Sequence, residues 1–233
     1  MRRSVPPSLV ARPLPPPAVC EMSELCALLA GYFLGAIPFA YVIARMRTGV
    51  DIRTVDIGNV GAGSVFRVVG FKEGLLTLAG DVGKGYAAIV LAQLLGVGSY
   101  WVLAAGILAV LGHVYPVYIG FRGGQGVATA MGVFLALAPI AMLLTLAVMG
   151  IALLLNIRRG LSRRLFLVVA CAAPFLPVFV YLTGSGFVFT LYAVVLLTFI
   201  ALRNLERLRH PRTITSRLLG ELEAPGLQEI HKE

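Results

Sequence analysis

Three glycine-rich stretches hold most of the polar side chains that could do chemistry in this chain of 233 residues. The first, residues 51–67, reads DIRTVDIGNVGAGSVFR and contains Asn59 among glycines, with Arg53 and Arg67 towards its ends. Glycine lets backbone N–H groups converge on an anion, and a guanidinium offers two parallel hydrogen bonds to phosphate oxygens. The stretch predicts a phosphate-binding loop, although a plain connection between two helices fits the same composition.

The second stretch, GDVGKG at residues 80–85, places Asp81 and Lys84 three positions apart at the mouth of an apolar segment. Residues at this spacing share one face of a helix, so we expect the two charges to pair. Ionisable groups at membrane depth are costly and usually serve a function. The structural alternative is a charge pair that reaches the membrane surface. The stretch is not a nucleotide-binding P-loop, because the GxxxxGK[ST] spacing is absent.

The third stretch, residues 112–129, reads GHVYPVYIGFRGGQGVAT. Its glycines follow Arg122 and open a predicted helix, whose first backbone N–H groups lack partners and attract an anion. His113 falls near the end of the preceding apolar segment, where it either contacts a ligand or is simply hydrogen-bonded. No Ser-His-Asp or Cys-His arrangement and no carboxylate pair is evident. Three such loops predict an anionic substrate, with two phosphates, handled by few conventional catalytic groups.

The elements that hold these residues must lie in a membrane. The chain is 58% hydrophobic and only 13% charged, against roughly 25% charged residues in soluble domains. This composition excludes an ordinary soluble domain, a disordered chain and a fibrous repeat. The net charge of +9 fits arginines in cytoplasmic loops better than nucleic-acid binding. The three cysteines form no CxxC pair, so neither a disulfide framework nor a zinc site is expected.

Long apolar stretches, most near the roughly 20 residues that cross a bilayer, predict an all-α polytopic membrane bundle. They cover residues 25–44 (broken by Pro38), 74–95, 100–119, 127–155, 165–182 and 187–202. The arginine-rich loop 156–164 and the tail after residue 202 should be cytoplasmic. All arginine-rich loops fall on that side if 127–155 is two short helices meeting near Pro139. We therefore expect seven transmembrane helices, an outside N-terminus, a cytoplasmic C-terminus and cytoplasmic glycine-rich loops.

Residues 1–21 differ in composition from the rest, because they hold six of the 13 prolines. Dense proline favours an extended, unpacked tail, and no apolar core of a signal peptide precedes Cys20. Met22 stands directly before the first apolar segment and is the alternative start of translation. We expect a disordered tail over residues 1–21, a membrane domain over 22–210 and a cytoplasmic tail over 211–233.

Taken together, these stretches resemble the bacterial acyl-phosphate:glycerol-3-phosphate acyltransferases (PlsY) from Met22 to about Glu221. The order and spacing of several patterns in a membrane setting are far more specific than any single one. The matches are G-S-I-P-F at residues 35–39, D-I/L-R-x-V-G-S-G-N-x-G-A-T-N-x-x-R at 51–67, L-D-x-x-K-G at Asp81, Lys84 and Gly85, G-H-x-F-P-x-F-x-x-F-K-G-G-K-G-V-A-T at 112–129, and H-R-x-N-I-x-R-L-L-x-G-x-E from His210.

The resemblance implies an enzyme of the bacterial cell membrane that moves a fatty acyl group from acyl phosphate to the sn-1 hydroxyl of glycerol 3-phosphate. The product would be lysophosphatidic acid, for phospholipid synthesis. The implied partners are the two substrates, membrane lipids and the enzyme that produces acyl phosphate, with no cofactor, metal or nucleic acid. Catalytic contacts are expected from Asn59, Arg67, Lys84 and His113. Substrate binding is expected from Arg53, Gly58, Gly61, Asp81, Arg122, Gly123, Gly124, Gln125, Gly126, Arg163 and His210.

Several family positions are substituted, which leaves alternatives open. The substituted positions are Ile57 for Ser, Gly63 for Thr, Gln125 for Lys, Arg163 for Ser and Thr213 for Asn. Losing a hydroxyl or an ammonium from a phosphate site costs roughly a few kcal/mol. One alternative is therefore a degenerate paralogue that binds lipid or phosphate with altered or no turnover. Another is a small anion transporter, although no internal repeat is detectable.

Overall fold

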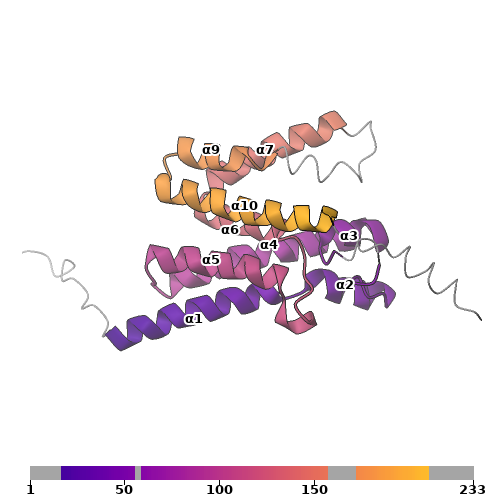
Figure 1. Cartoon of the computed structure of the whole chain (residues 1–233), viewed down its shortest axis with the longest axis horizontal. Helices are drawn as coiled ribbons and strands as arrows, with labels where there is room; N and C mark the ends of the chain where they lie inside the picture. The colour runs from indigo at the N-terminus through magenta and orange to yellow at the C-terminus, as the bar shows by residue number, and fades with distance from the viewer. Residues whose placement is uncertain (1–16, 56–58, 157–171, 210–233) are drawn as a thin grey trace, which may run out of the picture.

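The structure is a computed structural model that describes residues 17–55, 59–156 and 172–209. Every regular element in these ranges is helical, as the sequence predicts. In Figure 1 the long helices run along a common direction, and the short α2 and α3 lie at one end of the bundle. The elements are α1 (Pro17–Ala36), α2 (Phe39–Thr48), α3 (Ala62–Val68), α4 (Phe71–Leu94), α5 (Ser99–Val114), the 3-10 turn η2 (Val117–Ile119), α6 (Val127–Leu137), α7 (Pro139–Asn156), α9 (Phe175–Leu182) and α10 (Phe187–Arg209).

Prolines interrupt two of the apolar segments, which confirms the sequence prediction. The helix α1 ends at Ala36 and α2 begins at Phe39, with Pro38 between them. The helix α6 ends at Leu137, and α7 begins at Pro139. Proline has no backbone N–H and its ring clashes with the preceding turn, so a helix stops before it or starts at it. The first of these breaks contributes a backbone group to the candidate site.

Three boundaries differ from the expectation. The helix α1 begins at Pro17, inside the expected disordered tail, because proline suits a first helical position where its missing N–H is not needed. The helix α10 continues to Arg209, seven residues beyond the apolar stretch that ends at residue 202. Hydropathy marks where the apolar surface ends, and the helix itself can continue into polar residues. Finally, the glycine-rich stretch 51–67 contains most of a short helix, α3.

Glycines allow the central helices to approach one another at backbone distance. A Cβ atom built at Gly35 of α1 would overlap the backbone of Ala109 in α5. In the same way, a Cβ atom at Gly85 of α4 would overlap the carbonyl oxygen of Thr129 in α6. Small residues are typical of helix contacts in lipid, where close packing replaces the hydrophobic effect between helices. These contacts fix α4 and α5, which carry three of the predicted site residues, in a tight relation to α1 and α6.

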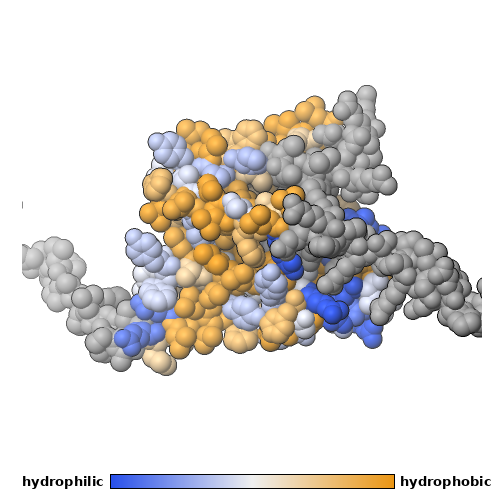
Figure 2. Space-filling model, in the orientation of Figure 1, coloured by the Kyte–Doolittle hydropathy of each residue, from blue (hydrophilic) through white to orange (hydrophobic). Residues whose placement is uncertain are grey.

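The outer surface of the bundle is suited to lipid. Within the described residues, four helical stretches are long and apolar enough to cross a membrane, namely Glu21–Thr48, Phe71–Leu94, Ser99–Ile119 and Phe187–Leu205. Large apolar side chains point outwards, with Leu143 57% and Val195 53% exposed. Figure 2 shows this apolar surface across the middle of the molecule, with hydrophilic residues towards its ends and most densely near α2 and α3. The protein is therefore a multi-pass membrane protein.

Candidate functional site

A buried ion pair joins Asp81 and Lys84 on one face of α4. The Lys84 Nζ is 2.8 Å from Asp81 Oδ1, and the two side chains are only 3% (Lys84) and 2% (Asp81) exposed. The pair confirms the prediction made from the i, i+3 spacing. Each charge alone would be strongly unfavourable away from water, so the two depend on each other.

The break between α1 and α2 supplies a second partner for Lys84. Its Nζ donates a hydrogen bond to the Ile37 carbonyl oxygen at 2.8 Å. Because Pro38 ends α1 at this point, the Ile37 carbonyl lies outside the hydrogen-bond ladder of that helix. The centroid of the Phe39 ring lies 5.9 Å from Nζ. Two of the three ammonium protons are thus committed to Asp81 and Ile37.

The helix α5 brings His113 to the same carboxylate. Its Nδ1 lies 3.4 Å from Asp81 Oδ1, and the residue is 6% exposed. Residue spacing did not predict this Asp–His pair, because the packing of α4 on α5 joins residues that are far apart in the chain. One signal was present: both residues are isolated polar side chains in apolar segments, and such side chains need partners.

The loop after η2 closes over His113. The Gly123 N–H donates to the Val114 carbonyl at 3.1 Å, and the Gly124 N–H donates to the His113 carbonyl at 3.0 Å. A Cβ atom at Gly124 would overlap both His113 Nε2 and the carbonyl oxygen of Val60. Here glycine permits close approach, and these two N–H groups hold the loop in place. The contact with Val60 also shows that the first and third glycine-rich stretches meet at His113.

The segment that contains Asn59 leads from this meeting point into α3. Asn59 is only 7% exposed. Gly61 forms the N-cap of α3, where its carbonyl accepts the N–H groups of Ser64 and Val65 at 3.1 and 3.3 Å. Arg67 lies on α3 with an exposed side chain, and its Nη2 is 3.4 Å from Ser64 Oγ. The short helix therefore places a guanidinium beside its own glycine-rich N-terminal turn.

Arg53 is engaged within the protein. Its Nη2 donates to Asp51 Oδ2 at 2.6 Å and its Nε to Oδ1 at 2.9 Å, while Nη1 donates to the Ile119 carbonyl at 3.2 Å. The guanidinium also lies over the Tyr41 ring, 4.9 Å from its centroid. Its side-chain hydrogen bonds hold the pKa of the Asp51 carboxyl below its ordinary value. In this arrangement Arg53 ties the loop after α2 to the turn η2.

The other predicted residues fall into two groups. Arg122 is exposed and Gln125 is half-buried in the loop before α6. Gly126 is the N-cap of α6 with a φ of +87°, a left-handed conformation that favours glycine. Predictions for the N-terminal tail 1–16 and for Gly58, Arg163, His210, Ile57 and Thr213 lie outside the described residues.

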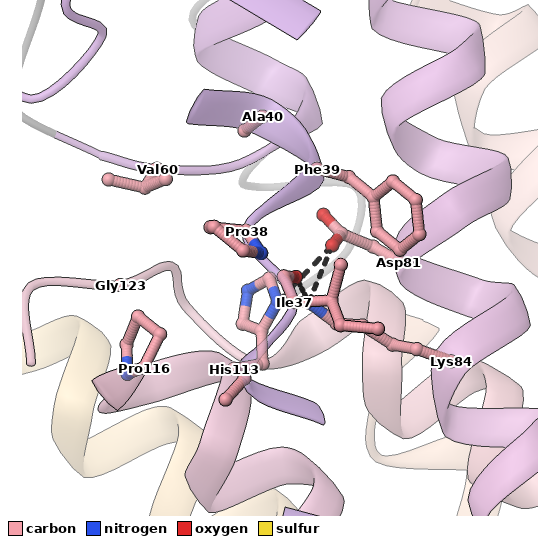
Figure 3. A pocket seen from close by; sticks show the side chains of 11 residues that line it. Ile37, Pro38, Phe39, Ala40, Val60, Asp81, Lys84, His113, Pro116 and Gly123 are labelled. Atoms are coloured by element: carbon pink, nitrogen blue, oxygen red, sulfur yellow. Dashed lines mark hydrogen bonds and ion pairs between the residues drawn. The ribbon is translucent and has the colours of Figure 1, made fainter. Parts of the chain in front are cut away.

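One small pocket gathers the central groups (Figure 3). Its polar side chains are Asp81, Lys84 and His113, and the break at Pro38 and Gly123 complete its walls. The cavity volume is about 10 Å³, which is room for one water-sized group. The opposite charges of the aspartate and the lysine cancel, so the pocket is polar with little net charge. Within the described residues, no three His, Cys, Asp or Glu side chains converge to hold a metal ion.

A second pocket, wholly apolar, lies between α6, α7, α9 and α10. Its volume is about 80 Å³, and Val127, the first residue of α6, lies on its wall. The pocket therefore begins next to the glycine loop and extends into the apolar part of the bundle. Its larger lining side chains are Met131, Phe134, Met142, Leu146, Leu176 and Leu197.

The comparisons with known proteins agree on one family. The family model described as glycerol-3-phosphate acyltransferase matches residues 25–211. The glycerol-3-phosphate acyltransferase of Geotalea daltonii is 37% identical over 187 residues, which cover 80% of this chain and 94% of the relative.

Two solved structures share the fold, both of PlsY (YgiH), an integral membrane glycerol 3-phosphate acyltransferase. The glycerol 3-phosphate form matches with a TM-score of 0.70 and 34% sequence identity, over 85% of this chain and 93% of that one. The lysophosphatidic acid form matches with a TM-score of 0.68 and 33% identity, over the same shares of 85% and 93%.

Proposed function

The chain belongs to the glycerol-3-phosphate acyltransferase family, and we propose that an acyl group passes from acyl phosphate to the sn-1 hydroxyl of glycerol 3-phosphate at the pocket of Asp81, Lys84 and His113. The product is lysophosphatidic acid, a precursor of phospholipids. The observation that carries the proposal is the convergence of all three glycine-rich stretches on this buried cluster. Ionisable side chains enclosed at membrane depth are expensive and fit a functional role.

The chemistry needs positioning more than strong acid or base catalysis. The sn-1 oxygen attacks the acyl carbonyl carbon, and the bond from that carbon to the phosphate oxygen breaks. The hydroxyl proton leaves on the inorganic phosphate, so no protein base is required. Acyl phosphate is a mixed anhydride with a good leaving group, and alignment of the two substrates can supply much of the lowering of the barrier. Fixed hydrogen-bond donors can stabilise the charge that develops on the carbonyl oxygen.

The phosphates would lie outside the small cavity, near the mouth formed by the glycine-rich segments. The helix α6 begins directly after the third glycine-rich loop, and the unpartnered N–H groups of a helix N-terminus favour an anion. Arg67 and Arg122 are exposed residues, and a guanidinium is suited to bind phosphate oxygens. Lys84 lies buried in the cavity itself, where its remaining proton can be donated to a small substrate group. Arg53 would act indirectly, by holding the loop after α2 in place.

The apolar pocket between α6, α7, α9 and α10 is the proposed place for part of the acyl chain. It begins at Val127, next to the loop that covers His113. An alkyl chain there would contact Met, Leu and Phe side chains. Burial of its surface would contribute about 25 cal/mol of binding free energy per Å².

We also propose that the site faces the cytoplasm in a bundle of seven transmembrane segments. In support, the described helices include α6 and α7 as two short apolar helices, in addition to the four longer candidate spans. The helix α9 lies within the remaining predicted segment, residues 165–182. This count places the arginine-rich loops on one side of the membrane. Reporter fusions test the arrangement: a result that puts Gly61 and Gly124 on opposite sides of the bilayer would refute it.

The activity is tested with the purified full-length protein in a lipid phase. Acyl phosphate and glycerol 3-phosphate should give inorganic phosphate, and Lys84→Ala should reduce this release by about tenfold or more. Lys72→Ala, an exposed lysine on the same helix, is the matched control and should leave the rate unchanged. If the unaltered protein releases no more phosphate than Lys84→Ala, the degenerate paralogue is the better description.

Two restored side chains form a companion experiment. Ile57→Ser and Gln125→Lys return a hydroxyl and an ammonium that the sequence pattern of the family contains. A large gain in phosphate release would show that these substitutions limit turnover in the present chain. An unchanged rate would show that the site works without them.

A further inference from the structure

Asp81 keeps one unused hydrogen-bond acceptor in the pocket. Its Oδ1 lies beside both Lys84 Nζ and His113 Nδ1, at 2.8 and 3.4 Å. Its Oδ2 is buried and has no hydrogen-bond partner among the described residues. Figure 3 shows this second oxygen free of dashed lines and directed away from both partners. A buried carboxylate oxygen without a donor is unfavourable, so a ligand that brings a donor to it is stabilised there.

The size and charge of the cavity select the kind of group that can meet Asp81 Oδ2. The volume of about 10 Å³ admits one water-sized group and no phosphate. A phosphate would also be repelled, because Asp81 Oδ2 carries negative charge and no donor from the described part of the chain lies beside it. Ionised acyl phosphate has no hydrogen-bond donor at all. A hydroxyl is small, carries a proton to donate and has no charge, so it fits.

Glycerol 3-phosphate has two hydroxyls, and their tasks differ. The C1 hydroxyl must contact the acyl carbonyl carbon, so the place where it lies must also have room for the acyl group. A water-sized cavity leaves no such space, so the C1 hydroxyl lies above it. The C2 hydroxyl takes no part in bond making and is one carbon away. We infer that the C2 hydroxyl of the acceptor donates its hydrogen bond to Asp81 Oδ2, which makes Asp81 a specificity-determining residue.

This contact would orient the acceptor within the reaction. With the C2 hydroxyl in the cavity, the charged phosphate at C3 points outwards to the arginines and the α6 N-terminus, and the C1 hydroxyl remains at the mouth. Asp81 itself is held in place because its Oδ1 is fixed by Lys84 and His113 from α4 and α5. The inference rests on the proposed function, since it assigns one group of that substrate to one atom.

The test compares two acceptors on each variant. Glycerol 3-phosphate and 3-hydroxypropyl phosphate have the same reacting primary hydroxyl and the same phosphate, but the second lacks the C2 hydroxyl. The measured quantity is the ratio of their kcat/KM values, from acceptor-dependent phosphate release. Any general loss of activity or of folded protein cancels in this ratio. The unaltered protein should prefer glycerol 3-phosphate by about tenfold or more.

Asp81→Ala should lower this ratio about tenfold to a hundredfold, because a hydrogen bond to a charged acceptor is lost. Asp81→Asn preserves the shape of the side chain and a neutral acceptor, so the ratio of kcat/KM values should fall only about threefold to tenfold. This variant still tests the contact if Asp81→Ala does not fold. Thr77→Val, a fully buried change one turn earlier on α4, should leave the ratio unchanged.

An unchanged ratio in both Asp81 variants would overturn the inference, and it would mean that only water occupies the cavity or that the C1 hydroxyl does. A preference below about twofold in the unaltered protein would overturn it as well. If the unaltered protein turns over neither acceptor, the proposed function itself fails.

Discussion

Removing the charge of Lys84 should destabilise the fold, and removing the charge of Asp81 at the same time should restore most of the loss. The two side chains are at most 3% exposed and their charged atoms are 2.8 Å apart. Breaking such a buried pair by removing one partner costs about 3–5 kcal/mol, since the other charge is left without compensation. For a chain of this size, each kcal/mol lowers Tm by about 2–4 °C. Lys84→Met alone should therefore lower Tm by about 6–20 °C.

The double variant Lys84→Met with Asp81→Asn replaces the ion pair by neutral groups of similar size. It should recover all but about 1 kcal/mol of the lost free energy of unfolding. The remaining loss corresponds to the hydrogen bond from Lys84 to the Ile37 carbonyl, which methionine cannot make. Thermal unfolding of the four proteins in detergent, at one scan rate, gives the coupling between the two positions. The double variant should be stable and yet inactive, because the pocket has lost the Lys84 ammonium. A double variant no more stable than the worse single one would refute this reasoning.

Two further predictions concern the loops. Gly124→Ala should reduce kcat/KM about tenfold or more, because its methyl group would overlap the His113 imidazole and displace it. Gly83→Ala is the control, because a Cβ there meets no atom of the described residues within 4 Å. Full activity in Gly124→Ala would contradict the close approach of Gly124 to His113. Arg53→Gln should lower Tm by about 2–4 °C at pH 7. Arg53 lowers the pKa of the Asp51 carboxyl, so its stabilisation is present at neutral pH and is lost as pH falls below about 4. The Tm difference should shrink at pH 3, and a gap that does not depend on pH would argue against the pair.

Local spacing was enough to predict several parts of the site. The Asp81–Lys84 pair follows from helix geometry, since positions three apart lie on one face whatever the rest of the fold does. The break at Pro38 follows from the chemistry of one residue. The start of α6 after the glycines of residues 123–126 also matches the expectation. Each of these depends on neighbours in the chain, which a sequence displays directly.

Partners from distant segments could not be predicted in the same way. Arg53 has the residue type of a phosphate ligand, yet in the structure its guanidinium bonds Asp51 and the Ile119 carbonyl. The N–H groups of Gly123 and Gly124 were expected to face an anion, and they bond carbonyls at the end of α5. Which donor meets which acceptor depends on how the helices pack, and residue type alone does not fix it.

A membrane-spanning helical protein could be predicted from composition, because the transfer of an apolar stretch into lipid is favourable whatever its tertiary contacts. The ordered motifs of the chain also pointed to the acyltransferase family. The packing of the helices, by contrast, was needed to show that His113 shares the Asp81 carboxylate and that one oxygen of this carboxylate, in a water-sized cavity, has no partner among the residues that the structure describes. Those facts arise where α4 packs on α5, with glycines holding α5 against α1 and α4 against α6 at backbone distance. Hydrogen-bond assignments at such a junction depend on distances of tenths of an ångström, which residue spacing does not encode.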